Sequence, residues 1–124
     1  MVLSSSFVFN SCSKEEYFDG QTWKGEKFDL PENSGELQIT LTFTGNQVSA
    51  KMKYTYKDDY DSESYSITAK GTYTYEKKKV RMNVESKDWD IDDTWSGKVD
   101  KERMTLNVVM NEMGLDEQVV FTKQ

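Results

Sequence analysis

The sequence is constrained first by the residue types that it lacks. Its 124 residues contain no histidine, one cysteine (Cys12) and one proline (Pro31). Without histidine, the chain has neither the commonest general base at neutral pH nor the commonest metal ligand, which disfavours triad catalysis and ordinary zinc sites. A lone cysteine cannot form an intramolecular disulfide. The fold must therefore be held together by its core.

Positive charge is also in short supply. The chain carries 16 Lys and Arg against 22 Asp and Glu, a net charge of −6. This balance argues against nucleic acid or anionic lipid headgroups as direct partners. Glycine-rich phosphate loops, a nucleophile elbow and a Cys/His pair are absent from the sequence. We therefore expect no enzymatic activity and no cofactor.

The size and composition still predict a folded domain. A chain of 124 residues corresponds to one domain. It is long enough to bury about two-thirds of its unfolded surface. Hydrophobic residues make up only 35%, but an aromatic content of 13% is not typical of disorder.

Apolar residues recur at every second position from residue 37 onward, which predicts strands. Gly45-Asn46 separates two alternating runs and suits a two-residue turn. That turn would set Phe43 opposite Val48 and Ile39 opposite Met52, with all these side chains on one face. The same reasoning places turns at 77–78 and 101–102, with Tyr73 facing Met82 and Val99 facing Met104.

The whole pattern predicts an all-β fold of eight strands. Their expected ranges are 22–30, 37–44, 47–57, 64–76, 79–86, 94–99, 103–110 and 117–123. Connections this short favour an antiparallel up-and-down arrangement, which can close into a barrel and remove its exposed edges. Gly71 and Gly97 fall at inward positions, where a coiling sheet bends sharply. A two-sheet β-sandwich of the same strands is the alternative.

The first residues look like the end of an export signal. Small Ser11 precedes Cys12 and follows the apolar run Phe7-Val8-Phe9, which resembles the end of a bacterial lipoprotein signal. Ser13-Lys14-Glu15-Glu16 is similar to the acidic export tag of Bacteroidota surface lipoproteins. The resemblance implies a signal remnant over 1–12, lipidation of Cys12, a tether over 13–20 and a domain over 21–124. The alternative is a tail with an inert thiol.

The domain itself resembles the small lipocalin-like lipoproteins of gut Bacteroidota. The likeness rests on Gly20-Gln-Thr-Trp23, the run 71–75, Trp95-Ser-Gly-Lys98 and the final Val119-Val-Phe-Thr-Lys123. It implies an eight-stranded lipocalin-like barrel with one open mouth, in which Lys123 covers Trp23 by a cation–π contact. Here Gly20 and Trp23 are one residue further apart than in the Gly-x-Trp signature of lipocalins.

The expected interior is rich in tyrosine, methionine and tryptophan. Such side chains suit a cavity for an apolar or aromatic ligand. An eight-stranded barrel can equally be filled by its own side chains. The candidate lumen residues are Trp23, Met52, Tyr54, Tyr56, Tyr73, Tyr75, Met82 and Trp95.

Two acidic clusters lie in expected loops, at 58–63 and at 88–93. Successive loops of an up-and-down barrel alternate between its ends, so both clusters are expected at the same mouth, as an acidic rim that favours cationic partners. Asp88, Asp90 and Asp92 have the Asp-x-Asp-x-Asp spacing that begins a calcium loop. Asp93 and Val99 stand where an EF-hand needs glycine and glutamate, which excludes that motif. A looser calcium site and a solvated acidic loop both remain open.

Together these patterns predict a binding protein rather than an enzyme. We expect an outer-membrane lipoprotein, exposed at the cell surface, that contacts the membrane only through Cys12. Its barrel would hold a small apolar or aromatic ligand. The alternative is a structural or interaction protein of the envelope, with a filled barrel and an envelope protein or glycan as its partner.

Overall fold

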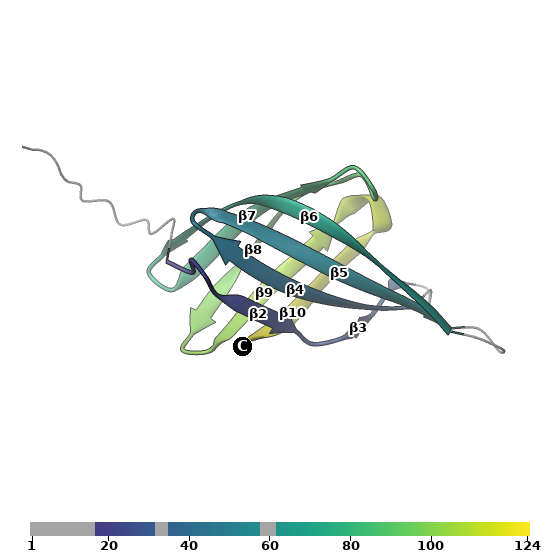
Figure 1. Cartoon of the computed structure of the whole chain (residues 1–124), viewed down its shortest axis with the longest axis horizontal. Helices are drawn as coiled ribbons and strands as arrows, with labels where there is room; N and C mark the ends of the chain where they lie inside the picture. Colours follow the sequence, from purple (N-terminus) through teal and green to yellow (C-terminus); the bar gives the residue numbers. More distant parts are fainter. Residues whose placement is uncertain (1–16, 32–34, 58–61) are drawn as a thin grey trace, which may run out of the picture.

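The protein is a single antiparallel β-sheet that closes on itself (Figure 1). The computed structural model describes residues 17–31, 35–57 and 62–124. The sheet order is β2-β10-β9-β8-β7-β6-β5-β4-β3, and β2 also pairs with β4. Because β2 bonds to both β10 and β4, eight of these strands form a closed up-and-down barrel, and β3 is an extra strand beside β4. A continuous closed sheet excludes the two-sheet sandwich.

The strands follow the alternating runs closely. They are β2 (Thr22–Gly25), β3 (Phe28–Asp29), β4 (Glu36–Thr44), β5 (Gln47–Lys57), β6 (Ser62–Glu76), β7 (Lys79–Ser86), β8 (Ile91–Asp100), β9 (Arg103–Met110) and β10 (Leu115–Lys123). A short 3₁₀ helix, η2 (Asn111–Met113), links β9 to β10.

Several predicted strand boundaries were wrong. β6 and β10 each begin two residues earlier than expected, at Ser62 and Leu115. The expected strand over 22–30 is split, because the Glu26 N–H bonds to the Val120 carbonyl (3.0 Å) at the end of β2 and the chain then continues along β4 alone as β3. The strand expected from residue 94 begins at Ile91. Asp92 and Asp93 therefore belong to β8 rather than to a loop, and their side chains fall on opposite faces of the sheet.

The predicted registers are confirmed. Phe43 pairs with Val48 and Ile39 with Met52. Tyr73 pairs with Met82, and Val99 with Met104. In the turn between β6 and β7, Lys77 and Lys78 both adopt positive φ (52° and 67°), the conformation that a two-residue hairpin turn requires.

Two inward-facing glycines allow the sheet to curl. A β-carbon at Gly71 would overlap the carbonyl oxygen of Asn83 on β7, and one at Gly97 would overlap that of Thr105 on β9. The neighbouring strand thus occupies the space in which any other residue would carry its side chain. The predicted role of Gly71 and Gly97 as sites of sharp bending agrees with this close approach.

The enclosed side of the barrel is one continuous hydrophobic core. Buried side chains from every barrel strand contribute to it, and the largest are Trp23, Trp95, Tyr73, Phe18, Phe43 and Phe121. Charged residues occupy the opposite face of the same strands; β7, for example, alternates strictly between exposed and buried positions over its first six residues. The period of two therefore separates core from solvent along the whole sheet.

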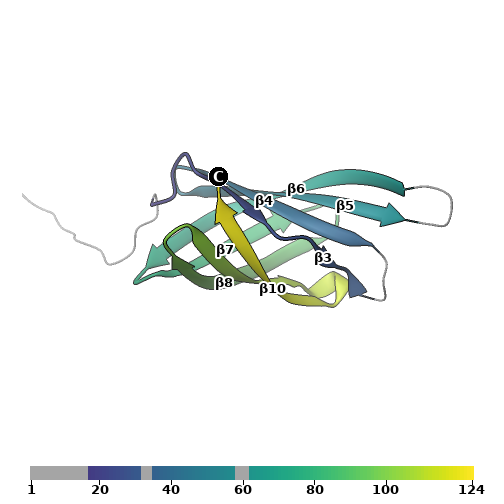
Figure 2. The ribbon, with the colours of Figure 1, turned by 90° about the horizontal axis from the view of Figure 1, so that it is seen from below.

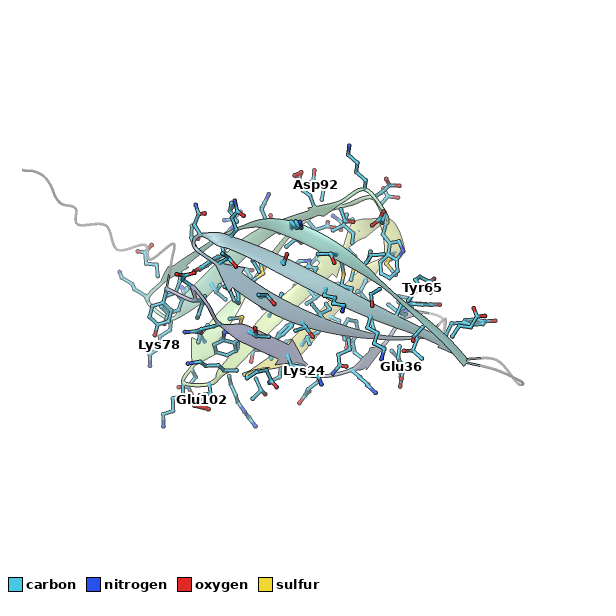
Figure 3. The ribbon with its side chains drawn as sticks, viewed as in Figure 1. Lys24, Glu36, Tyr65, Lys78, Asp92 and Glu102 are labelled. Atoms are coloured by element: carbon cyan, nitrogen blue, oxygen red, sulfur yellow. The ribbon has the colours of Figure 1, made fainter. Side chains whose placement is uncertain are left out.

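The two ends of the barrel differ in their connections. One end carries the turns 45–46, 77–78 and 101–102 together with the segment 17–21, and we call it the closed end. The other end carries the β3–β4 and β5–β6 connections, the loop 87–90 and η2, and we call it the mouth. The β5–β6 hairpin extends furthest at the mouth (Figure 2). Lys78 and Tyr65 mark opposite ends of the molecule in Figure 3.

Phe18 plugs the closed end. Its side chain is fully buried and packs against Trp23, Phe43, Tyr73 and Tyr75, with ring centroids 5.0 to 5.7 Å apart. The expected tether over 13–20 is therefore too long at its carboxyl side, because Phe18 belongs to the core. An aromatic ring gains enough by burial to order the backbone around it.

Hydrogen bonds fix the plug segment over the end of the barrel. The Phe18 N–H donates to the Tyr73 hydroxyl (2.9 Å), which itself donates to the Gly45 carbonyl (3.1 Å). The Asp19 carboxylate accepts from the Gly45 N–H (2.7 Å), and the Gly20 N–H donates to the Phe43 carbonyl (2.9 Å). The closed end is thus sealed by both side chains and backbone.

Substitution of Gly97 should test the close approach of strands. Gly97→Ala should lower the free energy of unfolding by about 3 kcal/mol, because the added carbon must displace backbone of β9. Gly114→Ala is the matched control: nothing lies near its β-carbon position, and its positive φ (66°) should cost about 1 kcal/mol. Urea denaturation measures both. Equal costs would contradict the role assigned to Gly97.

The plug has its own test. Phe18→Ala should destabilise the protein by about 3–5 kcal/mol, as expected for loss of a fully buried aromatic ring. The adjacent Tyr17 is 48% exposed and stacks on Tyr75, with ring centroids 4.3 Å apart. Tyr17→Ala should therefore lower the free energy of unfolding by only about 1 kcal/mol. Thermal unfolding compares the two, and similar losses would show that residue 18 is no part of the core.

Candidate functional site

The mouth of the barrel contains a hollow of about 350 Å³. Its lining comes from four places in the chain: Leu30 after β3, Tyr54 and Tyr65 on β5 and β6, Trp89 and Asp90 in the β7–β8 loop, and Glu112 and Met113 in η2. A concave site with aromatic and apolar walls and a few polar groups is the usual form of a small-molecule site. This hollow is the candidate functional site.

Three aromatic rings form its wall. Tyr54 and Tyr65 are tilted against each other at 5.0 Å between centroids. The Trp89 ring stands nearly perpendicular to both, at 6.0 Å from Tyr54 and 6.5 Å from Tyr65. Tyr65 is 53% exposed, and Trp89 and Tyr54 are half-buried. The rings are thus held in place by one another while part of each surface stays open to a ligand.

The loops that carry the remaining residues are tied to the barrel. Asp93, buried on β8, accepts a hydrogen bond from the Asn111 amide (2.8 Å) at the start of η2. This bond holds the helical turn that presents Glu112 and Met113 to the hollow. Asp90 adopts positive φ (51°) at the end of the β7–β8 loop, directly after Trp89. Asp93 therefore acts as a support rather than as part of an acidic loop.

Burial alters the acidity of one wall residue. Partial burial raises the pKa of the Tyr54 hydroxyl above its usual value near 10, and the hydroxyls of Tyr65 and Tyr56 raise it further. The Tyr54 hydroxyl is therefore protonated at neutral pH and able to donate a hydrogen bond. With Asp90 and Glu112 at its edge, the hollow offers aromatic faces, a phenol and two carboxyl groups.

The predicted lumen residues divide into three groups. Met52, Met82 and Trp95 are buried in the middle of the core, where the Trp95 indole N–H donates to the Val109 carbonyl (2.8 Å). Trp23, Tyr73 and Tyr75 lie around the plug at the closed end. Tyr54 borders the mouth hollow, and Tyr56, further along the same strand, is 43% exposed. Of the eight, Tyr54 alone lines the described hollow at the mouth.

Lys123 on β10 pairs with Trp23 on β2, the residue over which a cation–π contact was expected. Its side chain is exposed, however, whereas the Trp23 ring is buried. The Trp23 ring packs against Phe18 in an edge-to-face arrangement, with 5.7 Å between the ring centroids. The plug thus covers the tryptophan from inside the barrel.

The acidic clusters are only partly described. Residues 58–61 lie outside the described residues, and Glu63 is exposed on β6. Asp88 and Asp90 are exposed in the β7–β8 loop at the mouth, and Asp92 is exposed on β8. Within the described part of the chain, no three acidic or cysteine side chains are gathered closely enough to hold a metal ion. The calcium candidates Asp88, Asp90 and Asp92 therefore do not form such a group.

Five residues of the hollow were neither in the predicted lumen set nor among the calcium candidates: Leu30, Tyr65, Trp89, Glu112 and Met113. Trp89 carried a usable signal, since a tryptophan between Asp88 and Asp90 in a polar loop has no strand face to occupy. Leu30, Glu112 and Met113 reach the hollow only because the barrel closes and brings the β3–β4 connection and η2 to the same end.

When the chain is compared with known proteins, no protein-family model and no curated protein sequence matches it. Among the described residues, no helix has the length and apolar character needed to cross a bilayer.

The shifted pKa predicts a change of stability at alkaline pH. Unfolded Tyr54 loses its proton near pH 10, whereas in the folded protein the same hydroxyl keeps it to higher pH. The unfolded state therefore binds fewer protons in that window, and stability should fall as pH rises above about 10. Tyr54→Phe should reduce this slope in urea denaturation followed at several pH values. An unchanged slope would contradict the assignment.

Proposed function

We propose that this protein is a lipid-anchored binding protein of the bacterial cell envelope that takes a small aromatic or apolar ligand at the mouth of its barrel. The observation that carries the proposal is the hollow walled by Tyr54, Tyr65 and Trp89. These rings offer flat apolar faces to a ligand. Tyr65, taken as a whole residue, is 53% exposed. A ligand seated there would cover apolar surface that is otherwise open to water.

The edge of the hollow favours a ligand with positive charge. Asp90 and Glu112 are both exposed beside the rings, and the lining contains no basic side chain. A cationic group can contact aromatic faces and carboxylates at the same time. The ligand class proposed is therefore a small aromatic or apolar compound, with an ammonium group preferred over a carboxylate.

The anchor is proposed at Cys12. The support is the lipoprotein-like run before it and the acidic Ser-Lys-Glu-Glu run after it. Tyr17 lies at the closed end, stacked on Tyr75. Four residues lie between Cys12 and Tyr17, so five residue steps give a contour of at most about 18 Å. A lipidated Cys12 would therefore keep the closed end near the membrane and leave the mouth, at the opposite end, open to ligand.

A structural or interaction role is the second candidate. The observation in its favour is the interior: Met52, Met82 and Trp95 are at most 1% exposed and pack within one core. A barrel filled at mid-height has no room there for a guest molecule. In that case the exposed tyrosines at the mouth would meet an envelope protein or glycan instead.

Ligand binding is tested with two small aromatic probes of opposite charge. We expect phenylethylammonium to perturb the NMR signals of Tyr65, Trp89 and Met113, and phenylacetate to do so at least several-fold more weakly. Trp89→Ala should reduce the effect of the ammonium probe by about tenfold, since one ring of a small site contributes about 1.4 kcal/mol.

The matched control is Tyr17→Ala, which removes an exposed aromatic ring at the opposite end. It should leave probe binding unchanged. The assignment of the binding site to the mouth would be wrong if the probes changed only NMR signals of the closed end, or if the two variants had equal effects. Either result would favour the structural role.

The anchor is tested by membrane fractionation from cells. Cys12→Ala should move the protein from the membrane pellet to the soluble fraction after a high-salt wash, because two or three acyl chains are needed for stable anchoring. Ser66→Thr, a small change at an exposed position on β6 outside the signal, serves as the control. Unchanged fractionation of Cys12→Ala would end the lipoprotein proposal.

A further inference from the structure

The outer face of the barrel carries a basic groove despite the net charge of −6. This hollow has a volume of about 600 Å³ and lies across β6, β7 and β8. Four of its lining residues are basic, and one is acidic. The lining is Thr74, Glu76, Lys77, Lys79, Val80, Arg81, Ser96, Gly97 and Lys98. We call it the basic groove.

Strand register explains how the charges come together. Lys79 is paired with Lys98 on β8 and with Glu76 on β6, which makes one cross-strand row. Two residues further along β7, on the same face, Arg81 is paired with Thr74 on β6 and with Ser96 on β8. Two lysines directly opposite each other repel, and that repulsion costs free energy in an isolated antiparallel pair. An anion between Lys79 and Lys98 would remove this cost.

The hollow itself arises from small residues beside long ones. Arg81 has only Thr74 and Ser96 as its cross-strand neighbours on the outer face. Gly97, between Ser96 and Lys98, is an inward-facing position and contributes only backbone to the lining. The basic side chains therefore border a space that none of them fills, and their donor groups can converge on a group placed inside it.

The basic groove lies next to the closed end of the barrel. Lys77 and Lys78 form the β6–β7 turn, and Arg81 is three residues further along β7, about 10 Å from the turn. Lys78 projects from that end in Figure 3. Tyr17, where the described chain begins, stacks on Tyr75, the residue before Glu76. The amino-terminal segment thus joins the barrel beside the basic groove.

We propose that the basic groove docks the protein on anionic lipid headgroups, with lipid phosphates held by Lys79, Arg81 and Lys98. The choice of a lipid surface over other polyanions rests on the proposed anchor, which would hold this end of the barrel at the membrane. Arginine binds phosphate oxygens in a bidentate manner, and lysines add point charges. The mouth, with Asp90 and Glu112, then faces away from a negative surface that would repel it.

This proposal changes the expectation drawn from net charge. A net charge of −6 disfavours anionic partners only if the charge is evenly spread. Here four basic residues line one groove with a single acidic residue, so the local charge is positive even though Asp100 and Glu102 are exposed at the same end of the barrel. A long nucleic acid would have to pass over the acidic parts of the barrel, but a membrane meets only the end that is presented to it.

The test uses the full chain carrying Cys12→Ala, so that no lipid anchor can contribute. Its partition is measured at low ionic strength onto vesicles of phosphatidylglycerol and phosphatidylcholine in equal parts, and onto vesicles of phosphatidylcholine alone. We expect binding to the anionic vesicles only, and its loss as salt is raised. Adding Lys79→Gln and Lys98→Gln should weaken the partition roughly 20- to 30-fold, since each basic residue at an anionic surface contributes about fivefold.

Lys51→Gln with Lys53→Gln is the matched control. Both lysines are exposed on β5, outside the basic groove, and the double change alters net charge equally. It should weaken the partition less than threefold. Equal losses in the two double variants, or no binding to anionic vesicles, would overturn the proposal. Because Cys12 is absent throughout, these results are separate from the fractionation test of the anchor.

Discussion

Closure of the sheet is the constraint on which the rest of the structure depends. β2, the first barrel strand, has only four residues, yet it bonds to the second barrel strand, β4, on one side and to the last, β10, on the other. A sheet this small can coil so far only where strands come very close, and Gly71 and Gly97 provide those places. Once the sheet is closed, every second side chain is enclosed and no barrel strand has a free edge.

Closure also gives the molecule two distinct ends. In an up-and-down barrel, alternate connections gather at each end, so residues far apart in sequence become neighbours. Phe18 and the tight two-residue turns seal one end. The longer connections leave the other open, with Tyr54, Tyr65 and Trp89 around a hollow. The proposals of an anchored, basic end and a ligand-binding mouth both follow from this polarity.

The period of two and the turn residues were sufficient to predict most of the strands and their registers, whereas the barrel was predicted with a two-sheet sandwich as its alternative. They were sufficient because they are local: a two-residue turn and an alternating pattern determine which side chains face each other. The sequence could not reveal that Phe18 is a plug, because two adjacent aromatic residues in a polar segment, Tyr17 and Phe18, have no periodicity that shows which one is buried. Glu112 and Met113 were missed for a related reason, since η2 reaches the mouth only through closure.

The interior shows where composition alone was ambiguous. Tyrosine and methionine at inward positions suit either a cavity or a filled core, and the difference depends on packing across the barrel. In the structure, Met52, Met82 and Trp95 are buried together, and the hollow lined by aromatic rings lies at the mouth instead. Likewise, net charge concealed the basic groove, because only the pairing of β7 with β6 and β8 brings Lys79, Lys98 and Glu76 into one row.

The most direct test of the account is a set of backbone NOEs from β2 in the full chain. A closed barrel predicts cross-strand contacts from β2 in both directions, between Gly25 and Phe121 on β10 and between Trp23 and Leu41 on β4. Observation of both sets would establish closure in solution. Contacts to β4 without any to β10 would mean an open sheet, and would contradict the enclosed core, the plugged end and the mouth alike.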